Sequence, residues 1–449
     1  MLLSAALLSA ASSVTGQTPD EQLLQDALDL QARANVVQGS GARALGMGGA
    51  FLARADDATA ASWNPAGLSY LRQPEVSFVY SGGSLNSLEV SPTRNKDDRR
   101  DSHEPDFFAA TYPFEFRAVG GAVQISFQRL IPFGAERTLD ERDAETGEVF
   151  RHTDVSAAGG YDVIAFGTGI ALPRNIRVGA TINRWFNGYH QTLDRNTLRA
   201  GVPGHTSQES EYDLSGWNLN LGALWTPHVD LNIGAVYKTA FTGDVVLNKS
   251  RVDSQEVTPP VPPRTNQASS PDPQLGLGPV TLDLPAALGV GVSWRPRSRL
   301  TFSADYTYSF WSKGRIHNFF TLPQPVAGAT PTPYPTLPYP TLDPSVSQHD
   351  TEQVRGGVEF VFILGRVKVP VRAGAFSDGQ YVGDLYKTAP RFTGLSAGTG
   401  LAIGPILVDL AYIRERGRYK AATSSAADTT VSVHLQRFVA SAILRLPRR

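Results

Sequence analysis

Most of the chain beyond residue 73 alternates apolar and polar side chains with a period of two. Between Leu300 and Phe310, the even positions are apolar and the odd positions carry Thr, Ser and Asp side chains. Residues 217–225 and 367–374 follow the same pattern. A period of two places alternate side chains on opposite faces of a β-strand, and about ten tilted residues suffice to cross a membrane. The pattern therefore predicts β-strands of membrane-spanning length.

Fourteen segments of this kind occur, and the connections between them alternate between short and long. The predicted strands are 74–82, 106–114, 116–128, 160–172, 175–187, 213–226, 229–241, 283–295, 299–312, 352–363, 366–378, 391–402, 404–415 and 431–446. Long polar loops are predicted at 83–105, 129–159, 188–212, 242–282, 313–351, 379–390 and 416–430. Short turns at one end and long loops at the other are typical of outer-membrane barrels.

The predicted fold class is therefore all-β, a transmembrane antiparallel β-barrel of about 14 strands. A soluble β-sandwich shows the same alternation, but the even number of strands and the alternating connection lengths favour the barrel. Tryptophans next to predicted turns or loops are expected in the two interfacial aromatic girdles of such a barrel: Trp185, Trp217, Trp225, Trp294 and Trp311.

Composition excludes several other classes of protein. The chain has 41 Lys and Arg residues against 42 Asp and Glu residues, so no bulk positive charge indicates a nucleic-acid partner. It has no cysteine, which excludes disulfides, thiolate metal sites and cysteine nucleophiles. No run of about 18 apolar residues is present, so a membrane-spanning helix is not expected.

The chain divides into three predicted parts. Residues 1–16 are typical of a secretory signal peptide, with cleavage before Gln17. Residues 17–73 are expected to contain a short helix at 19–35 and a hatch that plugs the barrel lumen, and residues 74–449 form the barrel with long extracellular loops. This organisation predicts export to the outer membrane of a Gram-negative-type bacterium.

The hatch is expected from residues 41–71, which are rich in glycine and alanine and end in Trp63-Asn64-Pro65-Ala66-Gly67. Such small residues fit a crowded lumen. Pro65 suits the first turn of a short helix, and Asn64 is expected to cap it. The paired Asp56 and Asp57 are expected either to bind lumenal basic residues or to cap a helix.

This segment, together with residues 282–313 and 395–413, resembles the FadL/TodX family of outer-membrane transporters for hydrophobic compounds. The resemblance implies a hatch that plugs the barrel, and passive diffusion of long-chain fatty acids or aromatics past it. The gating residues would be Asn64, Pro65, Ala66 and Gly67, and a static plug is the alternative. The same signature is similar to PorV-type barrels, which serve a secretion system as shuttle proteins, and this is the alternative function.

Two further sets of residues are candidate functional sites. Gly120 and Gly121 are expected to weaken the third strand, and the family resemblance implies that a kink there opens the wall for lateral exit. Ordinary barrel glycines are the alternative. The predicted lumen face carries candidate anchors for a substrate carboxylate: Arg177, Arg295, Arg355 and Arg372. A structural network of paired charges is the alternative.

No catalytic, metal or cofactor site is predicted. Ser432 and His434 share one face of the last strand, but no acid or amide is in place to orient the histidine for nucleophilic catalysis. The remaining histidines lack metal-ligand spacing. The sequence therefore predicts a monomeric protein without enzymatic activity, whose partners are hydrophobic small molecules and outer-membrane lipid.

Overall fold

A computed structural model describes residues 39–447 apart from positions 93, 118, 200–201, 257–263, 271–279, 315, 318–348, 382–388 and 424–425. The predicted signal peptide and the predicted helix at 19–35 lie outside the described residues. Within them, no helix combines the length and the apolar character needed to cross a membrane.

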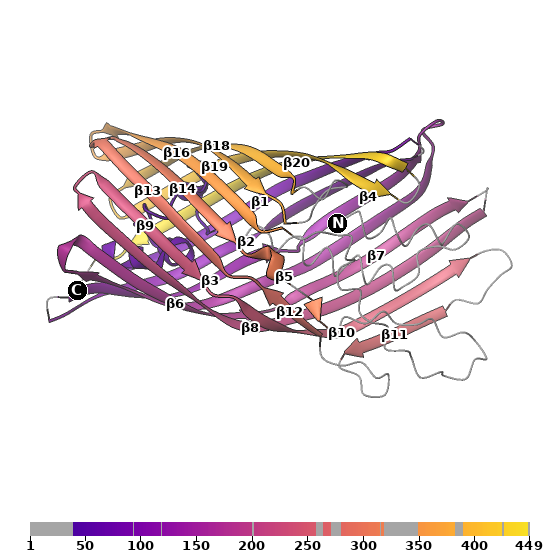
Figure 1. The fold of residues 1–449 in the computed structure, drawn as a ribbon, viewed down its shortest axis with the longest axis horizontal. Coiled ribbons are helices and arrows are strands. Elements are labelled where there is room, and N and C mark those ends of the chain that lie inside the picture. Colours follow the sequence, from indigo (N-terminus) through magenta and orange to yellow (C-terminus); the bar gives the residue numbers. More distant parts are fainter. Residues whose placement is uncertain are drawn as a thin grey trace.

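Fourteen antiparallel strands of the described chain form a closed ring (Figure 1). They are β1 (Glu75–Val90), β2 (Arg94–Phe116), β3 (Val119–Pro132), β5 (Val149–Leu172), β6 (Ile176–Phe186), β8 (Val202–His228), β9 (Leu231–Lys238), β13 (Ala287–Arg297), β14 (Leu300–Ser309), β16 (Thr351–Leu364), β17 (Val367–Gly379), β18 (Arg391–Ile403), β19 (Ile406–Thr423) and β20 (Ala426–Arg445). Each strand pairs with the next, and β20 pairs with β1. The predicted 14-stranded barrel is confirmed.

The alternation along the strands separates an outward face from a lumenal face as predicted. On β14, Phe302 is 43% exposed, whereas Thr301 and Asp305 are buried. Trp294 lies opposite Phe302 on β13 and is 52% exposed. Outward apolar side chains on every strand are typical of a lipid-facing band.

Two of the five tryptophans are not in the expected girdles. Trp217, Trp225 and Trp294 are exposed on the outer surface, but Trp185 and Trp311 are buried inside. Trp185 shares the lumenal face of β6 with Thr181 and Asn183, so strand parity turns it inward. Trp311 belongs to the short helix η3 (Trp311–Lys313), which follows β14.

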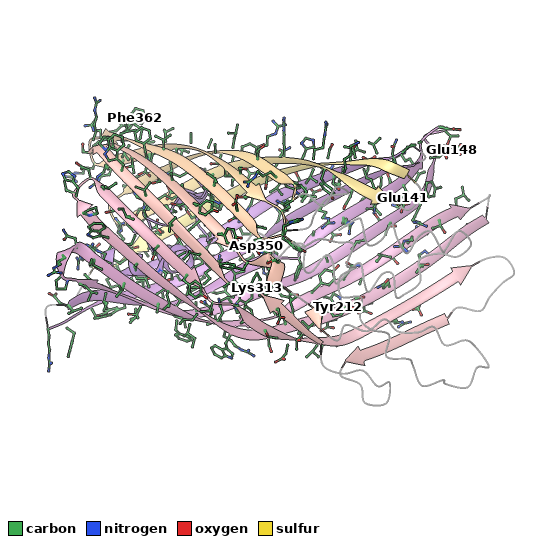
Figure 2. All side chains as sticks on the ribbon, viewed as in Figure 1. Glu141, Glu148, Tyr212, Lys313, Asp350 and Phe362 are labelled. Atoms are coloured by element: carbon green, nitrogen blue, oxygen red, sulfur yellow. The ribbon has the colours of Figure 1, made fainter. Side chains whose placement is uncertain are left out.

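The strands continue well beyond the membrane at the end with long connections. The extension adds β4 (Ala135–Asp143), β7 (Gly188–Arg199), β10 (Phe241–Glu256), β11 (Arg264–Ser270), β12 (Val280–Leu284) and β15 (Ile316–His317). Figure 2 shows Glu141 and Glu148 in this extension and Phe362 at the opposite end. Segments predicted as polar loops are thus largely β-structure. The prediction was wrong there because most side chains of these strands are polar on both faces, so the buried face is not marked by a run of apolar residues.

The hatch segment precedes β1 and contains three short helices. They are α3 (Ala42–Gly46), α4 (Ala60–Trp63) and the 3-10 helix η1 (Pro65–Tyr70). A further 3-10 turn, η2 (Pro173–Asn175), joins β5 to β6. Apolar side chains of the hatch pack against inward side chains of the wall, including Val79, Phe107 and Val236. The hatch therefore shares one core with the barrel.

Candidate functional site

Residues 39–71 lie inside the barrel, and nearly all of their side chains are buried. Wall side chains bind the hatch backbone directly. The Asp305 carboxylate on β14 accepts hydrogen bonds from the amides of Phe51 at 2.6 Å and Leu52 at 2.8 Å. The Gln124 amide on β3 donates to the carbonyl of Ala58 at 2.8 Å. These bonds satisfy hatch groups that have no partner in regular secondary structure.

The Asn64 turn connects the hatch to two wall strands. The Asn64 side-chain oxygen accepts a hydrogen bond from the Ala66 amide at 3.1 Å, which caps η1 with Pro65 in its first turn. The side-chain nitrogen donates to the carbonyls of Leu52 at 3.0 Å and Ala223 at 3.1 Å, and more weakly to Ala235 at 3.4 Å. Asn64 is fully buried, so this side chain is both a cap and a tether to β8 and β9.

Glycines in the wall allow the hatch backbone to approach it closely. A Cβ atom on Gly179 would lie 2.3 Å from the Pro65 carbonyl carbon, and one on Gly222 would lie 2.1 Å from the Asn64 side-chain oxygen. On the other side of the barrel, a Cβ atom on Gly357 would lie 2.2 Å from the Met47 carbonyl oxygen. Any larger residue at these positions would displace the hatch.

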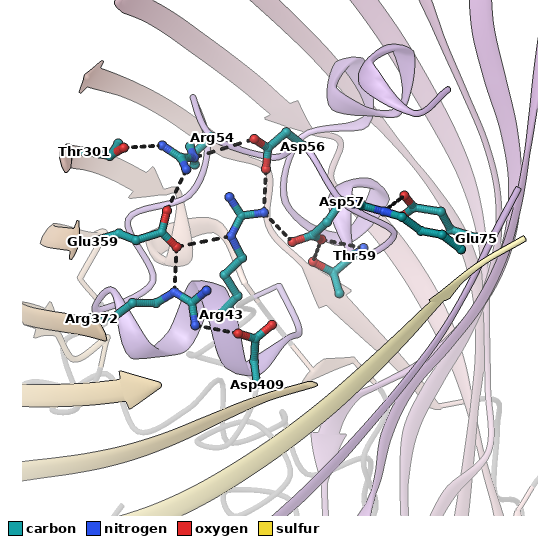
Figure 3. Close-up of polar contacts among 11 residues, drawn as sticks. Arg43, Arg54, Asp56, Asp57, Thr59, Glu75, Thr301, Glu359, Arg372 and Asp409 are labelled. Carbon is teal, nitrogen blue, oxygen red and sulfur yellow. Dashed lines mark hydrogen bonds and ion pairs between the residues drawn. The ribbon is translucent and has the colours of Figure 1, made fainter. Parts of the chain in front are cut away.

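A network of charged side chains joins the hatch to β16, β17 and β19 (Figure 3). The Glu359 carboxylate lies 2.7 Å from the Arg54 guanidinium, 2.8 Å from that of Arg372 and 3.6 Å from that of Arg43. Arg43 also contacts Asp56 at 2.7 Å and Asp57 at 3.1 Å. The paired aspartates therefore bind an arginine of the hatch itself, and Asp57 additionally accepts a hydrogen bond from the Thr59 amide before α4.

The four arginines proposed as carboxylate anchors have different environments. Arg355 binds both carboxylate oxygens of Asp378 at 2.7 Å and donates to the Gly48 carbonyl at 3.0 Å. Arg372 binds Glu359 at 2.8 Å and Asp409 at 2.6 Å. Both guanidinium groups are buried and occupied by these partners. The geometry supports the structural alternative for these two.

The other two arginines lie near the short-turn end of the barrel. The Arg177 guanidinium stacks 4.0 Å from the ring centroid of Tyr70, the last residue of η1. Arg295 is exposed near the end of β13. The four arginines are therefore not gathered in one binding site.

Gly120 and Gly121 are the second and third residues of β3 and not its middle, where the sequence pattern placed them. The β2–β3 ladder runs unbroken through both residues. The irregularity on β3 lies elsewhere, because its register with β5 shifts between Arg129 and Ile131. On the other side, Gly121 pairs with Ile170 of β5 and Gly120 lies just outside the paired stretch, at the end of the strand, so neither glycine interrupts a ladder within β3.

A cavity lies between the hatch and the long-connection end of the barrel. Its floor includes the hatch residues Leu52 and Trp63, and its volume is about 110 Å³. The aromatic side chains Trp185, Phe241 and Trp311 line its walls. Sequence reasoning missed these three as site residues, although the inward parity of Trp185 on its strand is readable from the alternation of residues 181–185.

The cavity wall also carries polar and charged side chains, among them Asn218, Asp305 and Arg355, and two of its features bear on function. Lys238, at the end of β9, lines the cavity, and no ion pair within the described residues engages its ammonium group. Leu130 lines the cavity at the register shift of β3, next to an Arg129–Asp162 pair with N–O distances of 2.8 and 3.0 Å. The cavity therefore borders the Lys238 ammonium group and the register shift between β3 and β5.

The family model described as BamG matches residues 38–322, which is more than half of the chain. A search of curated proteins found no match. The fold and the family place the protein in the outer membrane of a Gram-negative-type bacterium.

Solved structures with the same fold include a Pseudomonas aeruginosa FadL homologue, with 13% identity, a TM-score of 0.61, and coverage of 91% of this chain and 99% of that one. The Pseudomonas putida toluene transporter TodX has 12% identity, a TM-score of 0.58, and coverage of 92% and 100%. The Ralstonia pickettii toluene transporter TbuX has 17% identity, a TM-score of 0.54, and coverage of 92% and 99%. These neighbours confirm the predicted FadL/TodX-type fold, and TodX and TbuX are described as toluene transporters.

Proposed function

The chain belongs to the BamG family, and on that premise we propose that it is a passive outer-membrane channel for small hydrophobic compounds. The observation that carries this proposal is the cavity above the hatch, which has aromatic walls. Its volume of about 110 Å³ is comparable to the ~150 Å³ apolar cavity that binds benzene in another protein. Toluene transporters among the structural neighbours support the same class of substrate.

Lys238 is the side chain that would distinguish acids from hydrocarbons. Because its ammonium group lines the cavity and no ion pair within the described residues engages it, it would bind the carboxylate of an aromatic or short fatty acid. It takes this role in place of the four predicted arginines, since Arg355, which also lines the cavity, is bound to Asp378. Replacing it with methionine should reduce uptake of labelled benzoate and leave uptake of toluene unchanged. Equal effects on both compounds would contradict this assignment.

The proposed route passes over the hatch and out through the wall. The buried bonds of Asn64, Asp305 and Glu359 hold the hatch in place, so gating by displacement of the whole hatch would have to break all of them. The β3–β5 seam offers an alternative, because it borders the cavity and its register shifts beside Leu130. A bulge leaves ladder groups unpaired and weakens pairing locally. We place the lateral exit there, and not at Gly120 and Gly121.

Filling the cavity tests the proposal. Ala165 lines the cavity from β5, and Ala165→Phe should reduce toluene uptake into proteoliposomes without loss of the folded barrel on a gel-mobility assay. Ala442→Phe is the matched control, because Ala442 is exposed on the outer face of β20. If both variants transport as well as the wild type, the cavity is not on the route, and the secretion-shuttle alternative gains support.

Cysteine pairs test the exit separately, since the chain has no native cysteine. Gln128 and Val163 face each other across the β3–β5 seam, and both line the cavity. Oxidation of the Gln128→Cys/Val163→Cys variant should block uptake, and reduction should restore it. The control pair is Thr307→Cys/Gln353→Cys, which crosses the regular β14–β16 ladder at the same cavity. Uptake that is insensitive to the first pair would rule out this exit.

A further inference from the structure

A row of arginines lies on the outer face of β19, above the lipid-facing band. Arg414, Arg416 and Arg418 are all exposed, whereas the alternating residues Ile413, Glu415 and Gly417 lie on the opposite, lumenal face. Residues two apart on one strand are separated by roughly 7 Å, so the three guanidinium groups form a continuous basic row. Below them on the same face are Tyr412 and Leu410, which are apolar or aromatic.

No carboxylate neighbours this row in the strand register. The partners of the three arginines on β20 are Gln436, His434 and Ser432, and those on β18 include Leu395 and Thr393. Within the described residues, no hydrogen bond or ion pair engages these three side chains. Other arginines of the rim differ, because Arg391 binds Glu352 at 2.9 Å.

Directly below the arginine row, the outer wall is hollowed. The groove crosses β17 to β20, β1 and β2, and its floor is made of small residues such as Ala397, Thr399 and Ala440. Phe438, which is 62% exposed, and Tyr412 form its rim, with ring centroids 4.8 Å apart. The Asp101 carboxylate also lines the groove but lies 3.0 Å from Arg99. Aromatic residues at this level mark the membrane interface.

We propose that this face is a binding site for a phosphate-bearing lipid of the outer leaflet. The phosphate binds Arg414 and Arg416, with Arg418 available for a second phosphate, and an acyl chain lies in the groove beneath. Guanidinium groups match phosphate oxygens in bidentate geometry, and three cations without a carboxylate partner leave the site complementary to an anion. The headgroup level lies just above the aromatic rim, which is where the arginine row begins. This site is separate from the cavity and does not depend on the proposed transport.

The test is native mass spectrometry of the full chain in neutral detergent, titrated with diphosphoryl lipid A. The wild type should retain bound lipid, and the Arg414→Gln/Arg416→Gln/Arg418→Gln variant should bind it roughly 10- to 100-fold more weakly. Arg391→Gln is the control, because that rim arginine already has a carboxylate partner, and its lipid binding should be unchanged. Gel mobility before and after heating verifies that each variant is folded.

Two further experiments distinguish binding of the whole lipid from binding of its phosphate alone. Ala397→Phe fills the groove without changing charge, and it should weaken lipid A binding while the arginines stay intact. Inorganic phosphate in excess should displace little lipid, since it lacks the acyl chains. Equal lipid binding by the wild type, the triple variant and Ala397→Phe would overturn the proposal. So would complete displacement by inorganic phosphate, which would make the row a free-anion site.

Discussion

The hatch–wall interface and the extracellular rim both contain many paired charges, but their surroundings differ. At the interface, the side chains of Arg372 and Glu359 are 3% and 4% exposed. At the rim, those of Arg391 and Glu352 are 48% and 46% exposed, at nearly the same N–O distance of 2.9 Å. The two glutamates both belong to β16, so the same type of ion pair occurs along one strand in two different dielectric environments.

This difference in exposure indicates which ion pairs hold the hatch in place. Charges at the rim remain hydrated, so an exposed pair contributes little. Buried charges have lost their hydration, so removal of one partner leaves the others uncompensated. The hatch should therefore be held in a single arrangement by its charges, whereas the rim should tolerate substitution. The following predictions test this contrast.

The largest effect is expected from Glu359→Gln, because three arginines share this carboxylate. Loss of the buried charge should lower the free energy of unfolding by about 3–5 kcal/mol. The matched variant on the same strand is Glu352→Gln, which should cost only about 0.2–1 kcal/mol. Thermal unfolding in detergent, followed by gel mobility, measures both. Similar midpoints for the two variants would show that burial does not separate the two regions.

A second contrast uses neighbouring glycines on β16. Gly357→Ala would bring a Cβ atom within 2.2 Å of the Met47 carbonyl oxygen, whereas Gly356 has open space around that position. Overpacking at Gly357 should cost about 1–3 kcal/mol. It should also loosen the hatch, which is observable as greater protease cleavage within residues 39–71. Gly356→Ala should leave both properties unchanged, and an equal response of the two variants would contradict the close packing.

Asn64→Ala should have a smaller effect on stability but should specifically weaken the closure of the lumen by the hatch. Loss of the cap should cost about 0.5–2 kcal/mol, and it also removes the tether to the carbonyls of β8 and β9. We expect increased single-channel conductance in planar bilayers with little change in the thermal midpoint of the barrel. Asn196→Ala, at an exposed rim position, is the control. Unchanged conductance of Asn64→Ala would show that the tether does not maintain the seal.

The smallest effect concerns pH at the rim, outside the membrane. The hydrogen bond to Asp140, helped by nearby Asp154, raises the pKa of His152 above its usual 6.5. A raised folded-state pKa stabilises β4 and β5 fully below the unfolded pKa, and this contribution is lost as the pH rises through the folded value. Hydrogen exchange of residues 135–157, corrected for intrinsic rates, should show less protection at higher pH. His152→Gln should abolish that dependence within residues 135–157.

Much of the fold was readable from the sequence because its signal is local. Alternation with a period of two, repeated in 14 segments with short turns between alternate pairs, predicted the strands and their outward face, including Phe302 and Trp294. The same alternation did not predict the strands that extend beyond the membrane. Strands such as β4 and β7 carry mostly polar side chains on both faces, and isolated buried residues such as Leu139 and Leu193 do not repeat often enough to give an apolar alternation.

By itself, the sequence determined that this chain forms a membrane barrel and that a small-residue segment is available to fill it. Only the tertiary structure decided which lumenal charges pair, because Arg54 and Glu359 are 305 residues apart and meet only when the ring closes. The same holds for Asn64 and the carbonyl of Ala223, 159 residues away. Strand parity specifies that a side chain faces the lumen. The tilt and stagger of the strands decide how high in the lumen that side chain lies and which residue it contacts. Tilt and stagger are properties of all 14 strands together.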